Sequence, residues 1–490
     1  MEDPTAAASV LDLPSESLLA LLSLCDASTL NNVAQAHSKL QDPVAIVISK
    51  RSLTRPLTQL QINSRLLWLT NHSDLVSKLH LSGRSSYRTA VSLRELPSQL
   101  HLDSLSLNEL QVQVQSGGGF AGVLHPGDPL KQLQLHDCTL LDGEDSLEAA
   151  LAQLPQLQDL STARLEAMGM DRTQFPGVLL LSVPLLTRLE LVYAYEVLPC
   201  SSALQHLPSL TALQDLTVEI TCSGSEDGDD DSAGVRISPS MLQPLQQLTS
   251  LQLYLAGAAF EPAALSGKTL LRKLHLFDAV IPGGAAGVSA LLLELQQLQE
   301  LSVLGLSNTL KHCAADASCY AALTASTRLA SLNLRSCMLP HGVWQHILRA
   351  GMELPLLQEL FMQYVSEGGQ LTSADMQRLV TAAPALRQLS SSQAQKPALL
   401  APLTNLTGLQ DLELSKVDDA GVGVLVQITG LRKLQLWGPS MVTEAGLLQM
   451  TVLQQLSSLM LYSLALKGWK DTLHFNSAPQ VRTVFTQHVE

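Results

Sequence analysis

The chain has 490 residues and a formal net charge of −14. This acidity argues against nucleic acid as the main partner, because phosphate binding requires a basic surface. No run of about 18 apolar residues is present, so the sequence predicts no membrane-spanning segment.

Residues 1–10 are expected to form a disordered leader, and their acidic start lacks the basic and apolar parts of a secretory signal. The seven cysteines are scattered and include no CxxC pair, which favours reduced thiols. We therefore expect a cytoplasmic protein, with the nucleus as the alternative.

Residues 11–45 are predicted to form a small helical unit. Leu13-Pro14 favours an extended entry, and the serines that follow can cap a helix ending near residue 24. A second helix is expected from near Ser28, because apolar residues then recur on one helical face. A unit this short buries little core by itself, so it must pack on a partner or on the first repeats.

The same segment resembles an F-box, whose pattern is LPxELLxxILxxLD followed by xxxLxxxxxVC. The match begins at Leu13-Pro14-Ser15-Glu16-Ser17-Leu18-Leu19 and continues to Val33 and Ala34. F-boxes bind the Skp-type adaptor of SCF ubiquitin ligases. The resemblance therefore implies an adaptor-facing set: Leu13, Pro14, Leu18, Leu19, Leu22, Leu24, Leu30 and Val33. Where the family carries a tryptophan after its second helix, this chain has Ser38-Lys39-Leu40, and a generic helical cap is the alternative interpretation.

Residues 46–75 are interpreted as a linker or an N-terminal cap of the segment that follows. The stretch 57–62 has the spacing of that segment's repeat, but it begins only 19 residues before the first regular copy at Val76. An atypical first unit is expected here, because the open end of a repeat array needs a cover.

From residue 76 to residue 490 the chain repeats the pattern LxxLxL. Clear copies are Leu130–Leu135 and Leu329–Leu334. The copies start at Val76, Leu102, Leu130, Leu157, Leu186, Leu213, Leu248, Leu271, Leu298, Leu329, Leu357, Leu386, Leu409, Leu431, Leu456 and Val481, which makes about sixteen repeats with a mean spacing of 27 residues. This pattern resembles the core LxxLxLxx(N/C) of leucine-rich repeats, and a period in this range indicates a solenoid.

The predicted fold class is therefore an α/β leucine-rich-repeat solenoid, a curved horseshoe with parallel strands on its concave face and helices on its convex face. Candidate return helices lie at 146–154, 240–248, 286–298, 374–382, 418–428 and 443–453. Cys138 and Cys337 each stand three places after the third core position. A small residue fits the turn under the strand there, so both cysteines are interpreted as structural.

An acidic run at residues 223–232 falls within the widest gap between copies. It contains five carboxylates and no basic residue. Such a stretch is expected to be solvated. It is either a tolerated loop insertion or a docking segment for a basic partner, and its spacing does not match a calcium-binding loop.

No motif indicates catalysis, a cofactor or a metal site. The stretch 266–269 imitates the end of a phosphate-binding loop, but Pro262 stands where the first glycine is needed. GxGxxG, HExxH and GxSxG are absent, and His341 and His346 are interpreted as surface or groove residues. The sequence therefore predicts a protein that is not an enzyme.

The variable residues of LxxLxL should point to the concave solvent side, because alternate strand residues face opposite sides. Candidate partner-binding residues there are Arg272, Lys273, His275, Arg432 and Lys433, together with the aromatic residues Tyr254, Phe277 and Trp437. Arginine and aromatic side chains are favoured binding anchors. The alternatives are aromatic packing along the rim and a charged face that serves only solubility.

The resemblance to F-box/leucine-rich-repeat proteins implies a substrate-recognition subunit of an SCF-type cullin–RING ubiquitin ligase. The helical unit would bind the Skp-type adaptor and its cullin complex, and the concave face would hold a substrate protein. The alternative is a repeat scaffold for protein interactions without a ligase role, in a cytoskeletal, ciliary or sensing assembly.

Overall fold

The structure is a computed structural model, and the residues it describes all lie in the repeat region. They are 78–82, 90–92, 102–113, 130–140, 151–152, 154, 156–163, 166–167, 180–181, 183–193, 204–220, 236–310, 315–437, 442–461 and 483–486. The predicted leader, the F-box-like unit, the cap at 46–75 and the acidic run at 223–232 lie outside these residues. The chain divides into two compact units, one of residues 1–215 and 222–226 and the other of residues 216–221 and 227–490.

The first unit is built on two parallel sheets. Its main sheet has the order β1 (Lys78–Ser82), β3 (Ser104–Asn108), β5 (Gln132–His136), β7 (Asp159–Ala163) and β9 (Arg188–Tyr193). The smaller sheet has the order β2 (Ala90–Ser92), β4 (Gln111–Gln113), β6 (Thr139–Leu140) and β8 (Glu166–Ala167). Each strand of the main sheet thus pairs with the equivalent strand of the next repeat.

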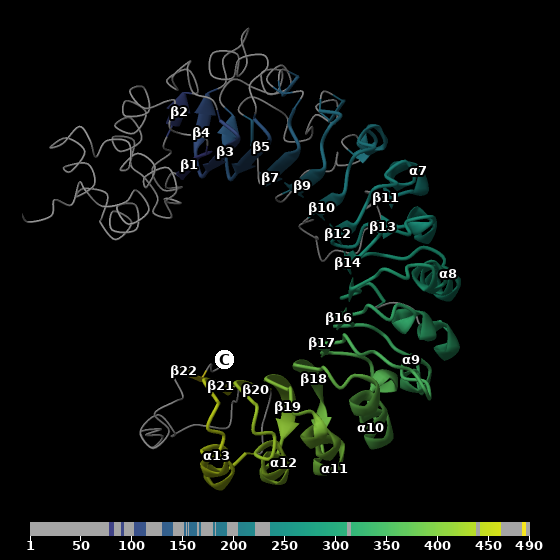
Figure 1. Ribbon diagram of the computed structural model, residues 1–490, viewed down its shortest axis with the longest axis vertical. Coiled ribbons are helices and arrows are strands. Elements are labelled where there is room, and N and C mark those ends of the chain that lie inside the picture. The colour runs from purple at the N-terminus through teal and green to yellow at the C-terminus, as the bar shows by residue number, and fades with distance from the viewer. Residues whose placement is uncertain are drawn as a thin grey trace, which may run out of the picture. The chain divides into compact units, whose positions relative to one another are not determined.

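The second unit continues the same plan with helices on the return segments. Its main strands, in order, are β10 (Asp215–Ile220), β12 (Ser250–Tyr254), β14 (Lys273–Phe277), β15 (Val303–Gly305), β16 (Ser331–Asn333), β17 (Glu359–Met362), β18 (Gln388–Gln395), β19 (Asp411–Val417), β20 (Lys433–Trp437), β21 (Ser458–Leu461) and β22 (Thr483–Thr486). Its α-helices are α7 (Pro239–Leu242), α8 (Gly284–Gln296), α9 (Trp344–Ile347), α10 (Ser373–Ala382), α11 (Pro397–Leu400), α12 (Asp419–Leu425) and α13 (Glu444–Met450). Within this unit the strands line one side and the helices the other (Figure 1). The predicted α/β leucine-rich-repeat solenoid is confirmed.

Most predicted return helices of the second unit are present, and one is much shorter than expected. Helices α8, α10, α12 and α13 occupy the predicted positions within a few residues. The helix expected at 240–248 is wrong beyond Leu242, where α7 ends. Pro244 stands two residues further on, and a proline has no backbone N–H to donate to the preceding helical turn.

The register between strands stacks leucine on leucine. Leu133 of β5 pairs with Leu105 of β3 and Leu160 of β7, and all three side chains are buried. Burial of this kind contributes about 1.5–3 kcal/mol per leucine relative to exposure. A repeat taken alone would expose its core on the two sides that contact its neighbours, so the core forms only when repeats stack.

The ninth copy of the repeat is shifted from its predicted start. Strand β15 pairs with β14 through Val303 opposite Lys273 and Leu304 opposite Leu274, so the copy begins at Leu301 and not at Leu298. Leucines at both positions gave two possible registers, and the observed one buries Leu304 and Leu306 together. The variable positions of this repeat are consequently Ser302, Val303 and Gly305.

A left-handed residue turns the chain after many of the strands. Asp137 has φ 51° and Ser336 has φ 54°, each two residues after the third leucine of its copy. The next residues, Cys138 and Cys337, are buried, and each Sγ–H donates to a carbonyl of the previous repeat, that of Leu107 at 3.4 Å and that of Leu306 at 3.0 Å. Burial raises the pKa of both thiols to about 12.

These contacts predict that both thiols resist alkylation while the protein is folded. The thiolate is the reactive species. Iodoacetamide at pH 8 should therefore modify Cys138 and Cys337 at least about 100-fold more slowly than the partly exposed Cys319. Site-resolved mass spectrometry measures the three rates. In urea the rates should converge, and equal rates in the folded protein would contradict the structural role.

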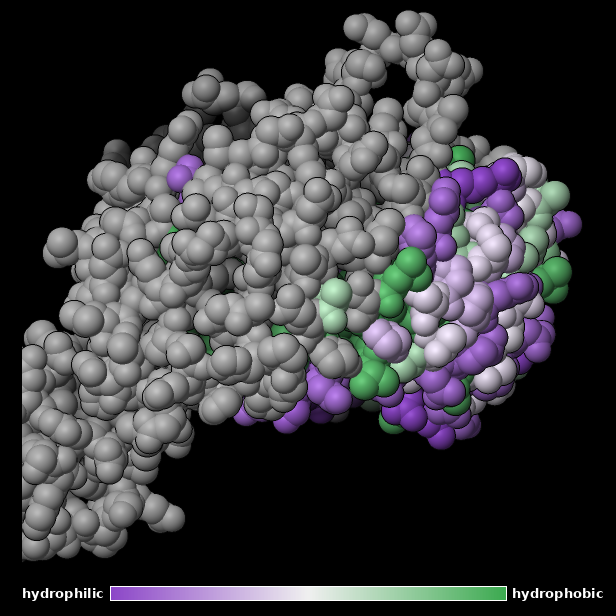
Figure 2. All heavy atoms as spheres, turned by 90° about the horizontal axis from the view of Figure 1, so that it is seen from above, coloured by the Kyte–Doolittle hydropathy of each residue, from purple (hydrophilic) through white to green (hydrophobic). Residues whose placement is uncertain are grey.

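Several large apolar side chains of the second unit are exposed. Leu293 of α8 is 62 % exposed, and Leu448 and Val452 near α13 are 60 % and 59 % exposed. In Figure 2 the coloured surface is mostly hydrophilic or intermediate, with hydrophobic residues in separate spots. Exposed apolar residues are normal on protein surfaces, and the coloured part of this view shows no large continuous apolar area.

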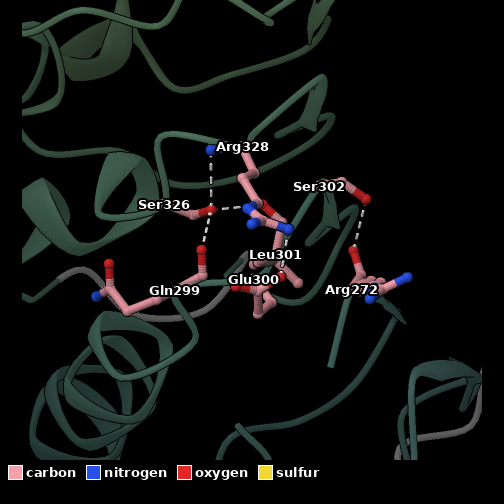
Figure 3. A network of polar contacts seen from close by, with 7 residues as sticks. All are labelled: Arg272, Gln299, Glu300, Leu301, Ser302, Ser326 and Arg328. Atoms are coloured by element: carbon pink, nitrogen blue, oxygen red, sulfur yellow. Dashed lines mark hydrogen bonds and ion pairs between the residues drawn. The ribbon is translucent and has the colours of Figure 1, made fainter. Parts of the chain in front are cut away.

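Among the described residues, two polar side chains occupy a position that is apolar in the other repeats, three residues before the first core leucine. Lys268 is 1 % exposed, and its Nζ donates to the Gln243 carbonyl at 3.0 Å. Ser326 is also buried, and its Oγ lies 2.8 Å and 2.7 Å from the carbonyl oxygens of Gln299 and Leu301 (Figure 3). Both polar groups therefore have hydrogen-bond partners in the preceding repeat.

Candidate protein-binding surface

The strand face of the second unit is defined as the solvent-directed side chains between and beside the core leucines of β12 to β21. Register pairing aligns its central row, which contains Gln252, His275, Gly305, Asn333, Phe361, Ser390, Glu413, Gln435 and Met460. The row mixes polar, charged and aromatic groups on one continuous parallel sheet. A surface of this kind is suited to a protein partner.

The structure brings the first group of predicted binding residues together on β12 and β14. Tyr254 and Phe277 are register partners, with ring centroids 5.9 Å apart and planes tilted by 40°. Phe277 remains 40 % exposed, so its ring is available to a ligand. Arg272 is exposed and Lys273 is half-buried at the other end of the strand.

His275 lies between these charged and aromatic ends. A methyl group at Gly305 on the neighbouring strand would lie 2.7 Å from Nδ1 of His275, so the glycine makes room for the imidazole ring. Burial lowers the pKa of His275, and the positive charge of Lys273 lowers it further. The neutral imidazole is thus favoured at this position.

The second predicted group lies on β20. Arg432 is exposed, and the Lys433 ammonium lies 3.2 Å from Oδ2 of Asp411 on β19. Trp437 ends the strand opposite Ser415. The two groups occupy strands of the same sheet but are separated by β15 to β19, so they do not form one contiguous site.

Between them lies a cluster that the sequence did not single out as a unit. The Arg335 guanidinium carbon is 4.7 Å from the centre of the Phe361 ring, a cation–π distance. Nη2 of Arg335 is 3.8 Å from Oε2 of Glu413, which also accepts a hydrogen bond from the buried Ser390 hydroxyl at 3.0 Å. Arg335 stands beyond the end of β16, so the strand pattern alone did not place it in this row.

The strand face of the first unit carries its own hydrogen-bonded chain. Oγ of Ser161 donates to Oε2 of Glu190 at 2.9 Å and lies 2.7 Å from Nε2 of His136. Because its single proton goes to the glutamate, the serine accepts from the imidazole and is not activated by it. Ser161 is 1 % exposed, and the arrangement is not that of a catalytic triad.

Asp159 lies on the same face and has one oxygen without a hydrogen-bond partner among the described residues. Burial raises the pKa of its carboxyl, and the neighbouring Glu190 and Asp215 act in the same direction, although Arg188 opposes them. A buried oxygen without a hydrogen-bond partner is poorly solvated, so this carboxyl lowers the stability of the fold.

Among the residues that the structure describes, no group of three or more histidine, cysteine or acidic side chains is placed to hold a metal ion. None of their helices has the length and apolar character needed to cross a membrane. The predicted adaptor-binding residues, from Leu13 to Val33, lie outside the described part.

Comparisons with known proteins found similarity at the level of solved structures. No protein-family model matches the sequence, and no curated protein matches it. One similar structure is an internalin from Listeria monocytogenes, with a TM-score of 0.45 and 16 % identity over 84 % of this chain and 98 % of that one. Another is a leucine-rich-repeat protein of Leptospira interrogans, with a TM-score of 0.47 and 16 % identity over 85 % of this chain and 91 % of that one. A third is the complex of Rad7 and Elc1 in yeast, with a TM-score of 0.38 and 15 % identity over 87 % of this chain and 95 % of that one.

Proposed function

We propose that the chain is a non-catalytic receptor that binds a partner protein on the strand face of its repeats and presents it to an SCF-type cullin–RING ubiquitin ligase. The observation that carries the binding role is the strand face of the second unit. There, charged and aromatic side chains stand at register positions of a continuous parallel sheet, while the leucines between them form the core. A rigid scaffold of this kind holds binding side chains at fixed spacings.

The ligase role is supported by the sequence of residues 11–45. Leucines there recur with the spacing of an F-box, which binds a Skp-type adaptor, and the repeat array follows after the linker or cap at residues 46–75. In this division of labour residues 11–45 hold the adaptor, the repeats hold the substrate, and other subunits transfer ubiquitin. A scaffold without a ligase link is the alternative, and it shares the binding role of the repeats.

A titration of the full chain with a purified Skp-type adaptor tests the ligase role. We expect binding at micromolar or tighter affinity. The double variant Leu18→Asp/Leu22→Asp should weaken it more than 100-fold, because each buried leucine contributes about 1.5–3 kcal/mol and each new carboxylate opposes burial. Isothermal titration calorimetry measures both affinities.

The matched control is Leu448→Asp, which places the same charge on an exposed leucine of α13. It should bind the adaptor like the unchanged chain. Absence of binding by the unchanged chain would overturn the ligase role, and so would equal weakening by the double variant and the control. The scaffold alternative would then stand.

A further inference from the structure

Two strands of the second unit carry the same sequence pattern. Residues Arg272-Lys273-Leu274-His275-Leu276-Phe277 and Arg432-Lys433-Leu434-Gln435-Leu436-Trp437 both read Arg-Lys-Leu-x-Leu-aromatic. The triplet Arg-Lys-Leu occurs nowhere else in the chain. We call these two stretches the first and second basic–aromatic cassettes.

The structure gives both cassettes the same layout. In each, the two leucines are buried, while the arginine and lysine stand at the start of the strand and the aromatic residue stands at its end. Lysine and ring are four residues apart, or about 13 Å along an extended strand. Each cassette therefore displays positive charge at one end of the strand face and an apolar ring at the other.

Charge and exposure indicate what the cassettes fit. Both arginines are exposed, and the Lys433 side chain is 57 % exposed although it pairs with Asp411. An exposed ion pair of this kind contributes about 0–1 kcal/mol, so an incoming carboxylate can compete for it. Phe277, at 40 % exposure, offers apolar area at the opposite end. The complementary ligand is an extended peptide with acidic residues at one end and a large apolar residue about 13 Å away.

The separation of the cassettes follows from the register. From β14 to β20 the sheet passes through β15, β16, β17, β18 and β19, which is six strand-to-strand steps. At about 4.8 Å for each step, the cassettes are about 29 Å apart as measured along the sheet. A single short peptide cannot occupy both, but one partner chain with two such segments can.

We propose that the strand face of the second unit binds a partner that presents two acidic–apolar segments in tandem, one on each cassette. The inference rests on the protein-binding part of the proposed function and is independent of the ligase part. Each segment binds weakly alone. Linkage raises the overall affinity, because the second segment binds from a high effective concentration.

The test begins with a phage-displayed library of random 12-residue peptides, selected on the full chain. Enriched peptides should carry acidic residues and a large apolar residue four positions away. One enriched peptide is then titrated by calorimetry, alone and as a tandem with a Gly/Ser linker of about 20 residues, whose average span is about 25 Å. The single peptide should bind with a stoichiometry of two. The tandem peptide should bind one to one and at least tenfold more tightly.

Charge-reversal variants assign the two sites. Arg272→Glu/Lys273→Glu and Arg432→Glu/Lys433→Glu should each reduce the stoichiometry of the single peptide from two to one and remove the gain of the tandem peptide. The control Arg387→Glu reverses an exposed arginine at the corresponding position of another repeat, outside both cassettes. It should leave stoichiometry and affinity unchanged.

Several outcomes would overturn the inference. They are enrichment of peptides without acidic residues, a stoichiometry of one for the single peptide, and equal loss with Arg387→Glu. Peptide selection that is unaffected when both cassettes are reversed would overturn it as well. The proposed adaptor binding depends on residues 11–45, and the peptide binding depends on the two cassettes. Either experiment can therefore fail while the other succeeds.

Discussion

Replacement of Trp344 by alanine is expected to lower the free energy of unfolding of the second unit by about 3–5 kcal/mol. Trp344 begins helix α9 and is 1 % exposed. Its indole Nε1 donates to the Gly369 carbonyl of the following repeat at 2.6 Å. Alanine would therefore leave a cavity between two repeats and a buried carbonyl without its donor. Urea unfolding followed by circular dichroism measures the loss.

The variant Trp344→Phe separates the two contributions. Phenylalanine keeps most of the buried volume but cannot donate to the Gly369 carbonyl, so a smaller loss, about 1–3 kcal/mol, is expected from the unpaired carbonyl. The matched control Leu448→Ala removes an exposed side chain from α13 and should change stability by less than about 0.5 kcal/mol. A loss below about 1 kcal/mol in the free energy of unfolding for Trp344→Ala would contradict a large contribution of this contact between repeats to stability.

A second substitution, at the buried Lys268, is expected to raise the free energy of unfolding. Lys268→Met is expected to stabilise the protein by about 1–2 kcal/mol at neutral pH, since buried charged groups can be replaced by apolar residues of similar volume with a gain in stability. Lys268 stands where the other described repeats, apart from the one with Ser326, have an apolar residue, and a carbonyl is its hydrogen-bond partner. Methionine keeps the long unbranched stem and removes the charge.

The pH dependence follows from the lowered pKa. Burial shifts the pKa of Lys268 below its ordinary value of 10.5, so the folded state binds this proton less tightly than the unfolded state does. The penalty is complete below the folded-state pKa and shrinks as the pH rises from that value towards 10.5. The advantage of Lys268→Met should therefore be larger at pH 7 than at pH 10. Urea unfolding at both values checks this, and an advantage that grows with pH would contradict the burial argument.

The repeat pattern predicted the solenoid because its period and its core are set by the same leucines. Fifteen of the sixteen copies have a strand that begins two residues after the copy starts. Cys138 and Cys337 were also interpretable from sequence, since each follows a fixed offset from the third core residue. The repeat core and the positions of the two cysteines depend on spacing along the chain, which can be read from the sequence alone.

Strand registers and helix ends were harder to predict from the sequence where two alternatives fit the same pattern. At Leu298 and Leu301 two registers fit the pattern, and only the pairing of β14 with β15 distinguishes them. The helix predicted at 240–248 ends at Leu242, because Pro244 interrupts the segment although its apolar spacing fits a helix. Helix propensity and periodicity are weak where a proline interrupts them.

Some residues of the candidate site could be predicted from the sequence, and others could not. Alternation along the strands was enough to place Lys273, His275 and Lys433 among the strand-face residues. The Arg335–Phe361–Glu413 cluster was not found, because its members come from three different repeats and meet only through the register of the sheet. Contacts across repeats cannot be read from the spacing within one repeat.

The stacked register of the second unit has a consequence for selectivity. The path along the sheet from β14 to β20 is a sum of six hydrogen-bonded steps, and such steps vary only between about 4.7 and 4.9 Å. Even if all six steps changed together across that range, the total would change by about 1.2 Å. If the proposed tandem partner binds here, the sheet would select it by the separation of its two segments, because each segment alone would bind weakly.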